Sequence, residues 1–431
     1  MNQSSPSVLQ RTLQRACDIE ASEVRVTLSS FLFVLILMAA YYILRPVRDA
    51  MASDWSDAEV SWLWTFTFFF SAIAVSLYGA AVARVRFVRL VPSVYGFFAL
   101  SFVLFYVGTQ TLADRILLDK SFYVWISVFS LFHISVFWSF MADLFSRPQA
   151  TRLFGFIGAG ASVGAIVGPA IAAGLAKNIG TDQLLLLASV LLIITIPNIL
   201  LLQRLKTRSD HNGGNAIGGN PFAGYSEFIK SPFLLGIGVF ILLYTSIGSF
   251  VYFELKNLLA DYDRETRSQI WATMDLVVNS MTMIIAAFAT GRIAKRMGLP
   301  FTLASVPMLI AGGLITLAAA PTVGVVIAIQ IIRRAGNYAI TRPAREMLFT
   351  AVDRETRFKA KPVIDIVIYR GGDMLNAWAF TALTHGLGLG LAAVAGVGAG
   401  IACLWAGTGI YLGRHFHATK IQQETDTTTD L

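Results

Sequence analysis

Two adjacent arginines, Arg333 and Arg334, lie near the middle of an apolar segment, residues 322–343. A charged side chain at the centre of a bilayer costs ~2.5–3.5 kcal/mol or more on insertion scales. At least one of the two must therefore face a protein partner, a water-filled cavity or an anionic ligand. Because neighbours on a helix point about 100° apart, only one can face a cavity squarely. Guanidinium groups bind phosphate and carboxylate through paired hydrogen bonds, so these arginines, with Asn337 one turn further on, predict a binding site for an anion.

Other charged residues lie inside further apolar segments. Arg370 and Asp373 are three residues apart, so they share a helix face and form either a structural pair or part of a site. Asp275 lies about one third of the way along its segment, as either a proton site or a hydrogen-bonding partner of another helix. We expect substrate binding by Arg48, Arg333, Arg334, Asn337 and Arg370, and coupling or gating by Arg45, Asp49, Glu254, Asp275 and Asp373.

The elements that must position these residues are membrane spans. Of the 431 residues, 55% are hydrophobic and only 14% are charged, whereas soluble domains carry roughly 25% charged residues. A helix that spans a membrane needs about 20 apolar residues. Twelve such segments follow one another, at 27–50, 60–82, 90–112, 121–145, 152–176, 183–203, 233–256, 268–290, 300–320, 322–344, 362–384 and 387–413.

We therefore predict an all-α membrane protein in which twelve transmembrane helices form two six-helix halves. A polar stretch rich in Gly and Asn divides the spans, and such a composition is typical of a flexible linker. Gly160, Gly164 and Gly168 line one face of the fifth span, which favours close packing of two helices. The predicted organisation is an N-terminal arm at 1–26, a first half at 27–203, a linker at 204–232, a second half at 233–413 and a tail at 414–431.

Lysine and arginine are distributed unevenly among the connections. With the N-terminus in the cytoplasm, about 23 of them fall inside, about 8 outside and three within spans. Since cytoplasmic loops carry the excess of Lys and Arg, both termini are predicted to be cytoplasmic. The first apolar run continues into a charged segment and is interpreted as a true span rather than a cleavable signal. The net charge of +8 thus reflects topology and not nucleic-acid binding.

Two groups of six spans joined by a cytoplasmic loop resemble the major facilitator superfamily. Residues 291–298 are similar to its loop motif, with Lys295 in place of the usual aspartate. The resemblance implies a substrate site between the halves near the midplane of the membrane. It also implies that the first, fourth, seventh and tenth helices line the cavity, and these helices carry charged residues such as Arg48, Glu254 and Arg333.

Two stretches are similar to the nucleotide transporter (ATP/ADP translocase) family of plastids and obligate intracellular bacteria, and to its relatives in free-living bacteria. The matching residues are Ile43, Leu44, Arg45, Arg48 and Asp49 in the first helix and Phe358, Lys359, Ala360, Lys361, Ile364 and Asp365 before the eleventh. Arg48 replaces a lysine of the family, Gln149 replaces a glutamate and Asp373 replaces a lysine. These departures imply an anion or a coupling mode other than strict ATP/ADP exchange.

The expected function is secondary transport across a bacterial inner membrane by alternating access. The expected substrate is a small organic anion, either a nucleotide or another phosphate or carboxylate compound, with a proton or a counter-substrate as coupling partner. No cofactor, metal or nucleic acid is expected. The alternative is a membrane scaffold or sensor that retains the transporter fold. An enzyme is not expected, because no nucleophile–base constellation, Walker loop or metal-ligand cluster appears in the sequence.

Overall fold

In the described part of the chain, the structure, a computed structural model, consists of helices and their connections. It describes residues 19–20, 22–84, 87–205, 223–288, 290–349, 352, 360 and 363–429, and leaves some side chains within these ranges undescribed. Two helices, α3 (Asp57–Arg84) and α10 (Arg264–Phe288), contribute one part to each of two compact units. The first unit comprises Met1–Ala52, Phe69–Gly214 and Tyr262–Leu276, and the second comprises Ser53–Phe68, Asn215–Asp261 and Val277–Leu431.

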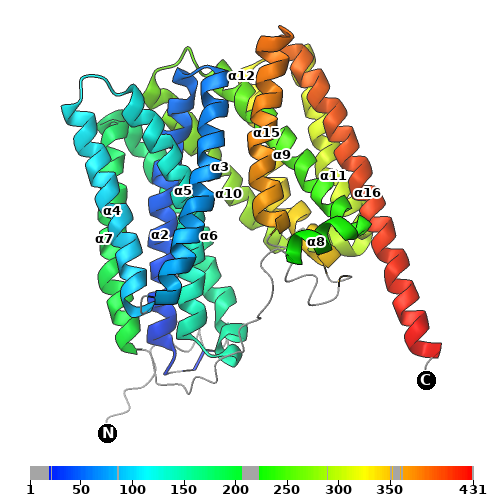
Figure 1. Cartoon of the computed structure of the whole chain (residues 1–431), viewed down its shortest axis with the longest axis horizontal. Coiled ribbons are helices and arrows are strands. Elements are labelled where there is room, and N and C mark those ends of the chain that lie inside the picture. Colours follow the sequence, from blue (N-terminus) through cyan, green and yellow to red (C-terminus); the bar gives the residue numbers. More distant parts are fainter. Residues whose placement is uncertain are drawn as a thin grey trace. The chain divides into compact units, whose positions relative to one another are not determined.

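The first unit is a helical bundle around α2. Its complete helices are α2 (Val24–Met51), α4 (Phe87–Thr111), α5 (Ile116–Leu144), α6 (Arg147–Ile179) and α7 (Thr181–Leu205). The central helix α2 packs against α5, α6 and α7, and α4 packs against α5 and α7 (Figure 1). The predicted first-half residues Arg45, Arg48 and Asp49 lie in the last turns of α2, which the bundle encloses.

Close contact between α2 and α6 follows from the glycine spacing. Gly160, Gly164 and Gly168 each face a backbone carbonyl oxygen of α2. A Cβ atom at Gly168 would lie 2.6 Å from the Ala39 oxygen, closer than side-chain atoms approach in proteins. Small residues at such positions allow two helix backbones to come together inside a membrane. The predicted close packing of this glycine face is confirmed.

The second unit is built around α9 (Pro232–Leu258), which packs against α12, α15 and α16. Helix α11 lies along α16 (Figure 1). The other elements are α8 (Ala223–Lys230), α11 (Thr290–Ala319), α12 (Val323–Gly336), η2 (Asn337–Thr341), α13 (Arg342–Leu348), η4 (Val363–Ile368), α15 (Tyr369–Thr381), η5 (Ala382–Gly386) and α16 (Leu391–Thr429).

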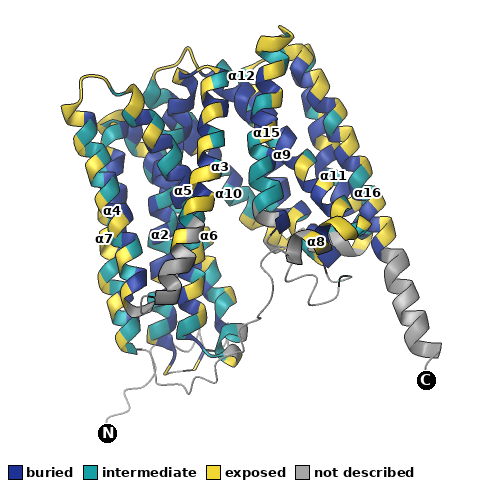
Figure 2. Ribbon diagram, viewed as in Figure 1, coloured by how far each residue is buried: buried dark blue, intermediate teal, exposed yellow. Residues whose placement is uncertain are grey.

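Each of the twelve predicted spans coincides with a helix or with consecutive helical elements. Nine helices among the described residues are long and apolar enough to cross a membrane. Large apolar side chains are exposed on several of these helices, including Leu104 on α4, Ile193 on α7, Leu309 on α11 and Leu404 on α16 (Figure 2). Apolar surface of this extent is suited to lipid, and the predicted all-α membrane fold is confirmed.

Turns of π-helix interrupt the tenth and eleventh predicted spans. The π-helical turn η2 starts at Asn337, just after the arginine pair, and η4 ends two residues before Arg370. Such turns occur frequently at functional sites. Glycine weakens a helix interior, yet α15 continues through both Gly371 and Gly372. Gly372 instead lets α15 approach α9, because a Cβ atom there would lie 2.6 Å from Thr245 Oγ1.

Candidate functional site

In the second unit, the side chain of Arg333 on α12 packs against α9. Its Nε and Nη2 atoms donate to Gln330 Oε1 at 2.9 and 2.7 Å, and its guanidinium carbon lies 5.5 Å from the centre of the Tyr244 ring. A Cβ atom at Gly248 would lie 3.0 Å from Nη1. The Tyr244 hydroxyl accepts a hydrogen bond from Asn337 Nδ2 at 3.1 Å. The guanidinium is therefore oriented from three sides and belongs with Asn337 to one cluster around Tyr244.

Arg370 and Asp373 are partly exposed although they lie deep in a predicted span. Their side chains are 25% and 23% exposed, and Arg370 Nη1 lies 3.6 Å from Asp373 Oδ2. Around α15, the exposed apolar residues Leu375 and Ala379 lie about 140° and about 180° away from Arg370. The apolar side of α15 is the one suited to lipid, since a charged side facing hydrocarbon would be costly. The charged side is therefore expected to meet water.

Asn376 fixes the position of α15 against α9 beside this charged side. Its Nδ2 atom donates to Thr245 Oγ1 at 3.1 Å, and its Oδ1 atom accepts from Ser246 Oγ at 2.8 Å. Both hydrogen bonds are buried. Breaking these hydrogen bonds would leave buried polar groups without partners, which costs free energy. They therefore hold α9 and α15, and the charged residues on α15, in fixed relative positions.

The Tyr244 cluster and the charged side of α15 are adjacent. The rings of Tyr244 and Tyr369 have their centres 6.1 Å apart. Asp373 interacts electrostatically with both Arg370 and Arg333. Together these residues form what we call the Tyr244 site: Tyr244, Gln330, Arg333, Asn337, Tyr369, Arg370 and Asp373. It brings together four of the ten residues that the sequence assigned to binding or coupling.

Arg334 and Glu254 belong to the second unit but are enclosed by the protein. Each is only 1% exposed. Arg334 follows Arg333 on α12 and so points about 100° away from it. Both carboxyl oxygens of Glu254 lack a hydrogen-bond partner among the described residues. A solute in water beside Arg370 would reach neither side chain without a change in conformation.

Four of the predicted residues form a chain of ion pairs in the first unit. Arg48 donates to Asp49 Oδ1 through Nε at 2.9 Å and Nη2 at 2.6 Å, and through Nη1 to Ser127 on α5. Arg45 lies 3.6 Å from Asp49 Oδ2 and 3.6 Å from Asp275 Oδ1 on α10. Two arginines and two aspartates balance in formal charge. The chain therefore joins the first part of α10 to α2 and α5.

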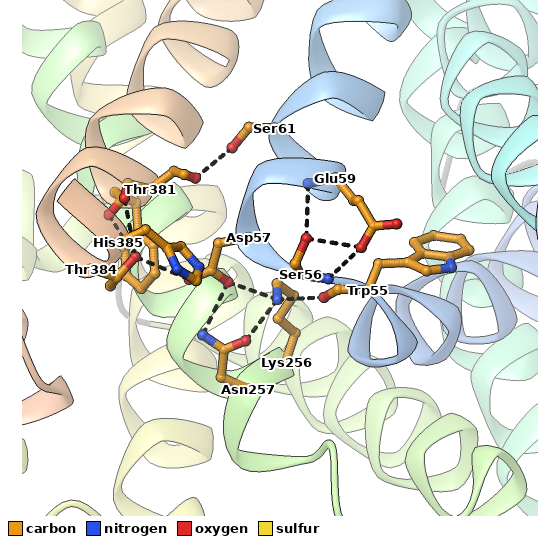
Figure 3. Close-up of polar contacts among 11 residues, drawn as sticks. Trp55, Ser56, Asp57, Glu59, Ser61, Lys256, Asn257, Thr381, Thr384 and His385 are labelled. Atoms are coloured by element: carbon orange, nitrogen blue, oxygen red, sulfur yellow. Dashed lines mark hydrogen bonds and ion pairs between the residues drawn. The ribbon is translucent and has the colours of Figure 1, made fainter. Parts of the chain in front are cut away.

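A buried cluster around Asp57 was not expected from the sequence. Lys256 Nζ lies 2.8 Å from Asp57 Oδ1, and Asn257 Nδ2 donates to the same oxygen at 3.1 Å. The other oxygen accepts from Thr384 Oγ1 at 3.1 Å and lies 3.7 Å from His385 Nε2. Figure 3 shows the side chains of α9 and η5 converging on Asp57, at the start of α3. Within the second unit, the cluster joins the first turn of α3 to the end of α9 and to η5.

Removing the lysine of this cluster is expected to destabilise the protein. Lys256→Met leaves the Asp57 carboxylate buried without its cation, and breaking a buried pair in this way costs ~3–5 kcal/mol. The melting temperature of purified Lys256→Met protein should therefore fall clearly below that of the wild type. The double variant Asp57→Asn/Lys256→Met should recover most of the loss, and a double variant as unstable as the single one would contradict this account.

Gln149, which stands where the resemblance places a glutamate, has a structural role. Its Oε1 atom accepts from the Ser146 backbone N–H at 3.0 Å, and its Nε2 atom donates to Glu23 at 2.9 Å. Burial alone would raise the pKa of Glu23, but hydrogen bonds from Gln149 and Arg152 outweigh it and hold this pKa below the ordinary 4.5. These contacts join the start of α6 to the start of α2.

The second stretch that resembles the ATP/ADP translocase family lies only partly within the described residues. Phe358, Lys359 and Lys361 lie outside the described residues, as does the side chain of Asp365. Ala360 and Ile364 are described and buried.

Several residues of these clusters were not predicted from the sequence, for different physical reasons. Gln330 lies three residues before Arg333, and Asn376 lies three residues after Asp373. Such spacing places each pair near one helix face, so a search for amides beside charges would have found them. Asp57 gave no comparable signal, because its partners come from helices far away in the sequence.

Comparisons with known proteins agree with this architecture. A sequence model of the Major Facilitator Superfamily matches residues 30–350. No curated protein sequence matches the chain. The specific resemblance to ATP/ADP translocases receives no support from these comparisons, which reach only the superfamily.

Solved transporter structures resemble the whole chain at low sequence identity. A bacterial homologue of the human lysosomal transporter Spinster is 15% identical with a TM-score of 0.62, covering 93% of this chain and 99% of its own. A bacterial homologue of the iron transporter ferroportin is 12% identical with a TM-score of 0.66, covering 90% and 99%. The nucleoside transporter NupG is 12% identical with a TM-score of 0.59, covering 92% and 99%. These likenesses establish a shared fold.

Proposed function

Because the chain belongs to the major facilitator superfamily, we propose that it is a secondary transporter for a small organic compound with an anionic group. The observation that carries this proposal is the Tyr244 site. Arg370 lies deep in a span, is partly exposed, and faces away from the apolar side of its helix. Partial exposure of a charge at this depth is explained by a water-filled path. A scaffold that only kept the fold would have no use for such a path.

Guanidinium groups support an anionic group on the substrate. Arg333 is oriented by Gln330 and Tyr244 before any ligand arrives, and Arg370 is the more exposed of the two. An oriented guanidinium can bind a carboxylate or a phosphate with two hydrogen bonds. The resemblance to ATP/ADP translocases favours nucleotides as one form of this anion, and carboxylates are the other. Inner-membrane location with both termini in the cytoplasm is part of the same proposal and rests on the distribution of Lys and Arg.

Uptake into proteoliposomes tests the proposed function. The purified full-length protein is reconstituted and supplied with labelled ADP, phosphate, succinate and glutamate. Saturable uptake of at least one compound, above that of protein-free liposomes, is expected. If no labelled anion enters at a saturable rate under proton gradients of either direction or with internal counter-substrate, the protein is not the proposed carrier and the scaffold reading stands.

Glu254 is proposed to couple transport to protons. Its enclosed carboxyl group accepts no hydrogen bond from the described residues, and an ionised carboxylate in such surroundings would be very costly. The neutral acid is therefore the stable form in this conformation. Exposure to water in another conformation of the cycle would release the proton, which links proton movement to substrate movement.

Glu254→Gln should uncouple the movement of protons from the movement of substrate. The amide keeps the shape of the neutral acid but cannot release a proton. We expect uptake driven by a proton gradient to fall at least tenfold in Glu254→Gln proteoliposomes, while exchange of internal for external substrate continues. Asp261→Asn, at an exposed carboxylate, is the matched control and should behave as the wild type. Gradient-driven uptake that survives in Glu254→Gln would remove Glu254 from the coupling step.

A further inference from the structure

Arg370 and Asp373 offer opposite charges side by side on the exposed side of α15. Their side chains are 25% and 23% exposed, and the closest nitrogen–oxygen distance between them is 3.6 Å. A charge-assisted hydrogen bond between such groups measures ~2.7–2.9 Å. The guanidinium and the carboxylate therefore attract each other but are too far apart for a charge-assisted hydrogen bond.

The Arg370–Asp373 pair is as long as the Arg45–Asp275 pair, which is also 3.6 Å, but the aspartate of that pair is only 1% exposed. Two other ion pairs are shorter. Lys256 and Asp57 are 2.8 Å apart and only 1% and 5% exposed at their side chains. Arg48 and Asp49 are 2.6 Å apart, and Asp49 is buried. In these two pairs the carboxylate is buried, and a short distance to the cation helps to offset its desolvation. Both side chains of the Arg370–Asp373 pair are partly exposed, so a solute can approach the two opposite charges together.

The surroundings of this pair suit a small polar molecule. The ring of Tyr369 lies next to the ring of Tyr244, and the Asp373 carboxylate also interacts electrostatically with Arg333. Residues three apart on a helix have Cβ atoms about 5–6 Å apart, a spacing that admits a short ligand carrying two charges. A carboxylate or phosphate placed at Arg370, on the side of Arg333, would leave an ammonium group beside Asp373.

We propose that the Tyr244 site takes a dipolar substrate, a small compound that carries an ammonium group a few bonds from its carboxylate or phosphate. Arg370 binds the anionic group and Asp373 binds the ammonium group. This assignment rests on the proposed transport function and narrows its substrate class. A purely anionic substrate would bring its charge next to the Asp373 carboxylate, and that repulsion disfavours it.

Matched ligand sets test the assignment. Each set holds one amino compound, the hydroxyl analogue and the analogue with neither group: alanine, lactate and propionate; glutamate, 2-hydroxyglutarate and glutarate; phosphoethanolamine, ethylene glycol phosphate and ethyl phosphate. Thermal stabilisation of the purified full-length protein gives the apparent affinities, and competition for uptake in proteoliposomes repeats the ranking. We expect the amino member of at least one set to bind at least tenfold more tightly than both of its analogues.

Two substitutions separate the roles of the two side chains. Asp373→Asn keeps the size of the side chain and removes its charge, so the preference for the amino member should fall to about twofold or less while the analogues keep their affinity within about threefold. Arg370→Gln should weaken every member of the set together, because all three carry the anionic group. Arg296→Ala, at an exposed position on α11, is the control and should leave the ranking unchanged.

The outcomes distinguish this inference from the transport function beneath it. Equal affinities within every set, or saturable uptake of ADP or the amine-free acids alone, would overturn the dipolar assignment while leaving an anion transporter. An unchanged amino preference in Asp373→Asn would also overturn it. Absence of saturable uptake for every compound would overturn the proposed function itself.

Discussion

Replacing Gly164 with leucine is expected to prevent the protein from folding to a stable state. A Cβ atom at this position would collide with the backbone oxygen of Leu35 and the Cβ of Met38 on α2. A backbone carbonyl cannot rotate aside as a flexible side chain can, so α2 and α6 would have to separate along the glycine face. Overpacking a core costs ~1–3 kcal/mol or more, and here it also disrupts the helix contact around which the first unit is built.

Gly174→Leu is the matched control for this prediction. Gly174 lies on the same helix, and nothing lies within 4 Å of a Cβ atom built there. The yield of monodisperse protein in detergent and its melting temperature should both collapse for Gly164→Leu and stay near the wild type for Gly174→Leu. A Gly164→Leu protein with wild-type yield and melting temperature would show that the contact is not needed.

Replacing Arg333 with alanine is expected to cost most of the transport activity without loss of folded protein. Hydrogen bonds to a charged group are worth ~1.5–3 kcal/mol, which corresponds to a fall of roughly ten- to a hundredfold in uptake efficiency. Tyr244 keeps its contacts with Asn337, Tyr369 and Trp405, so the helices should stay in place. Initial uptake rates across substrate concentrations give the measurement.

Arg333→Lys and Gln330→Leu refine the role of this guanidinium. Lysine keeps the charge but cannot offer two parallel donors, so Arg333→Lys should recover only part of the activity. Gln330→Leu removes the acceptor that orients Arg333 and should weaken uptake less than Arg333→Ala does. Unchanged uptake in Arg333→Ala, with Arg296→Ala as the exposed control, would remove Arg333 from the binding site.

The helical framework could be predicted from the sequence because bilayer thickness dictates the length of apolar runs. The first span, predicted at 27–50, corresponds to α2, and the glycine face of the fifth span predicted its contact with another helix. The tenth span was predicted as one helix, but α12 ends at Gly336 and a π-helical turn follows. Nothing in residues 337–341 distinguishes a π-helical turn from an α-helix, since both have similar side-chain requirements.

The site was predictable only where its residues share a helix. Arg370 and Asp373 could be paired from their spacing. The contact of Arg333 with Tyr244 could not, because it depends on how α12 packs against α9. The same holds for Lys256 and Asp57, whose pairing requires the first turn of α3 to lie against the end of α9. Charge at depth thus selected the candidate residues, and tertiary packing decides which of them are exposed.

The proposed water-accessible substrate path beside α15 can be tested by the reactivity of two neighbouring cysteines. Met374 lies about 40° from Arg370 and Leu375 about 140° from it around the helix. Each is replaced by cysteine in full-length protein in which Cys17 and Cys403 are serine, and the protein is reconstituted in liposomes. A charged, membrane-impermeant thiosulfonate reagent, applied on both sides, gives the labelling rate.

We expect Met374→Cys to be labelled at least tenfold faster than Leu375→Cys, and we expect a transported substrate to slow this labelling. Leu375 has the larger exposed fraction, 59%, so simple accessibility in the absence of lipid would give the opposite order. Equal rates, or faster labelling of Leu375→Cys, would show that no water-filled path runs beside Arg370 and would contradict the transport mechanism.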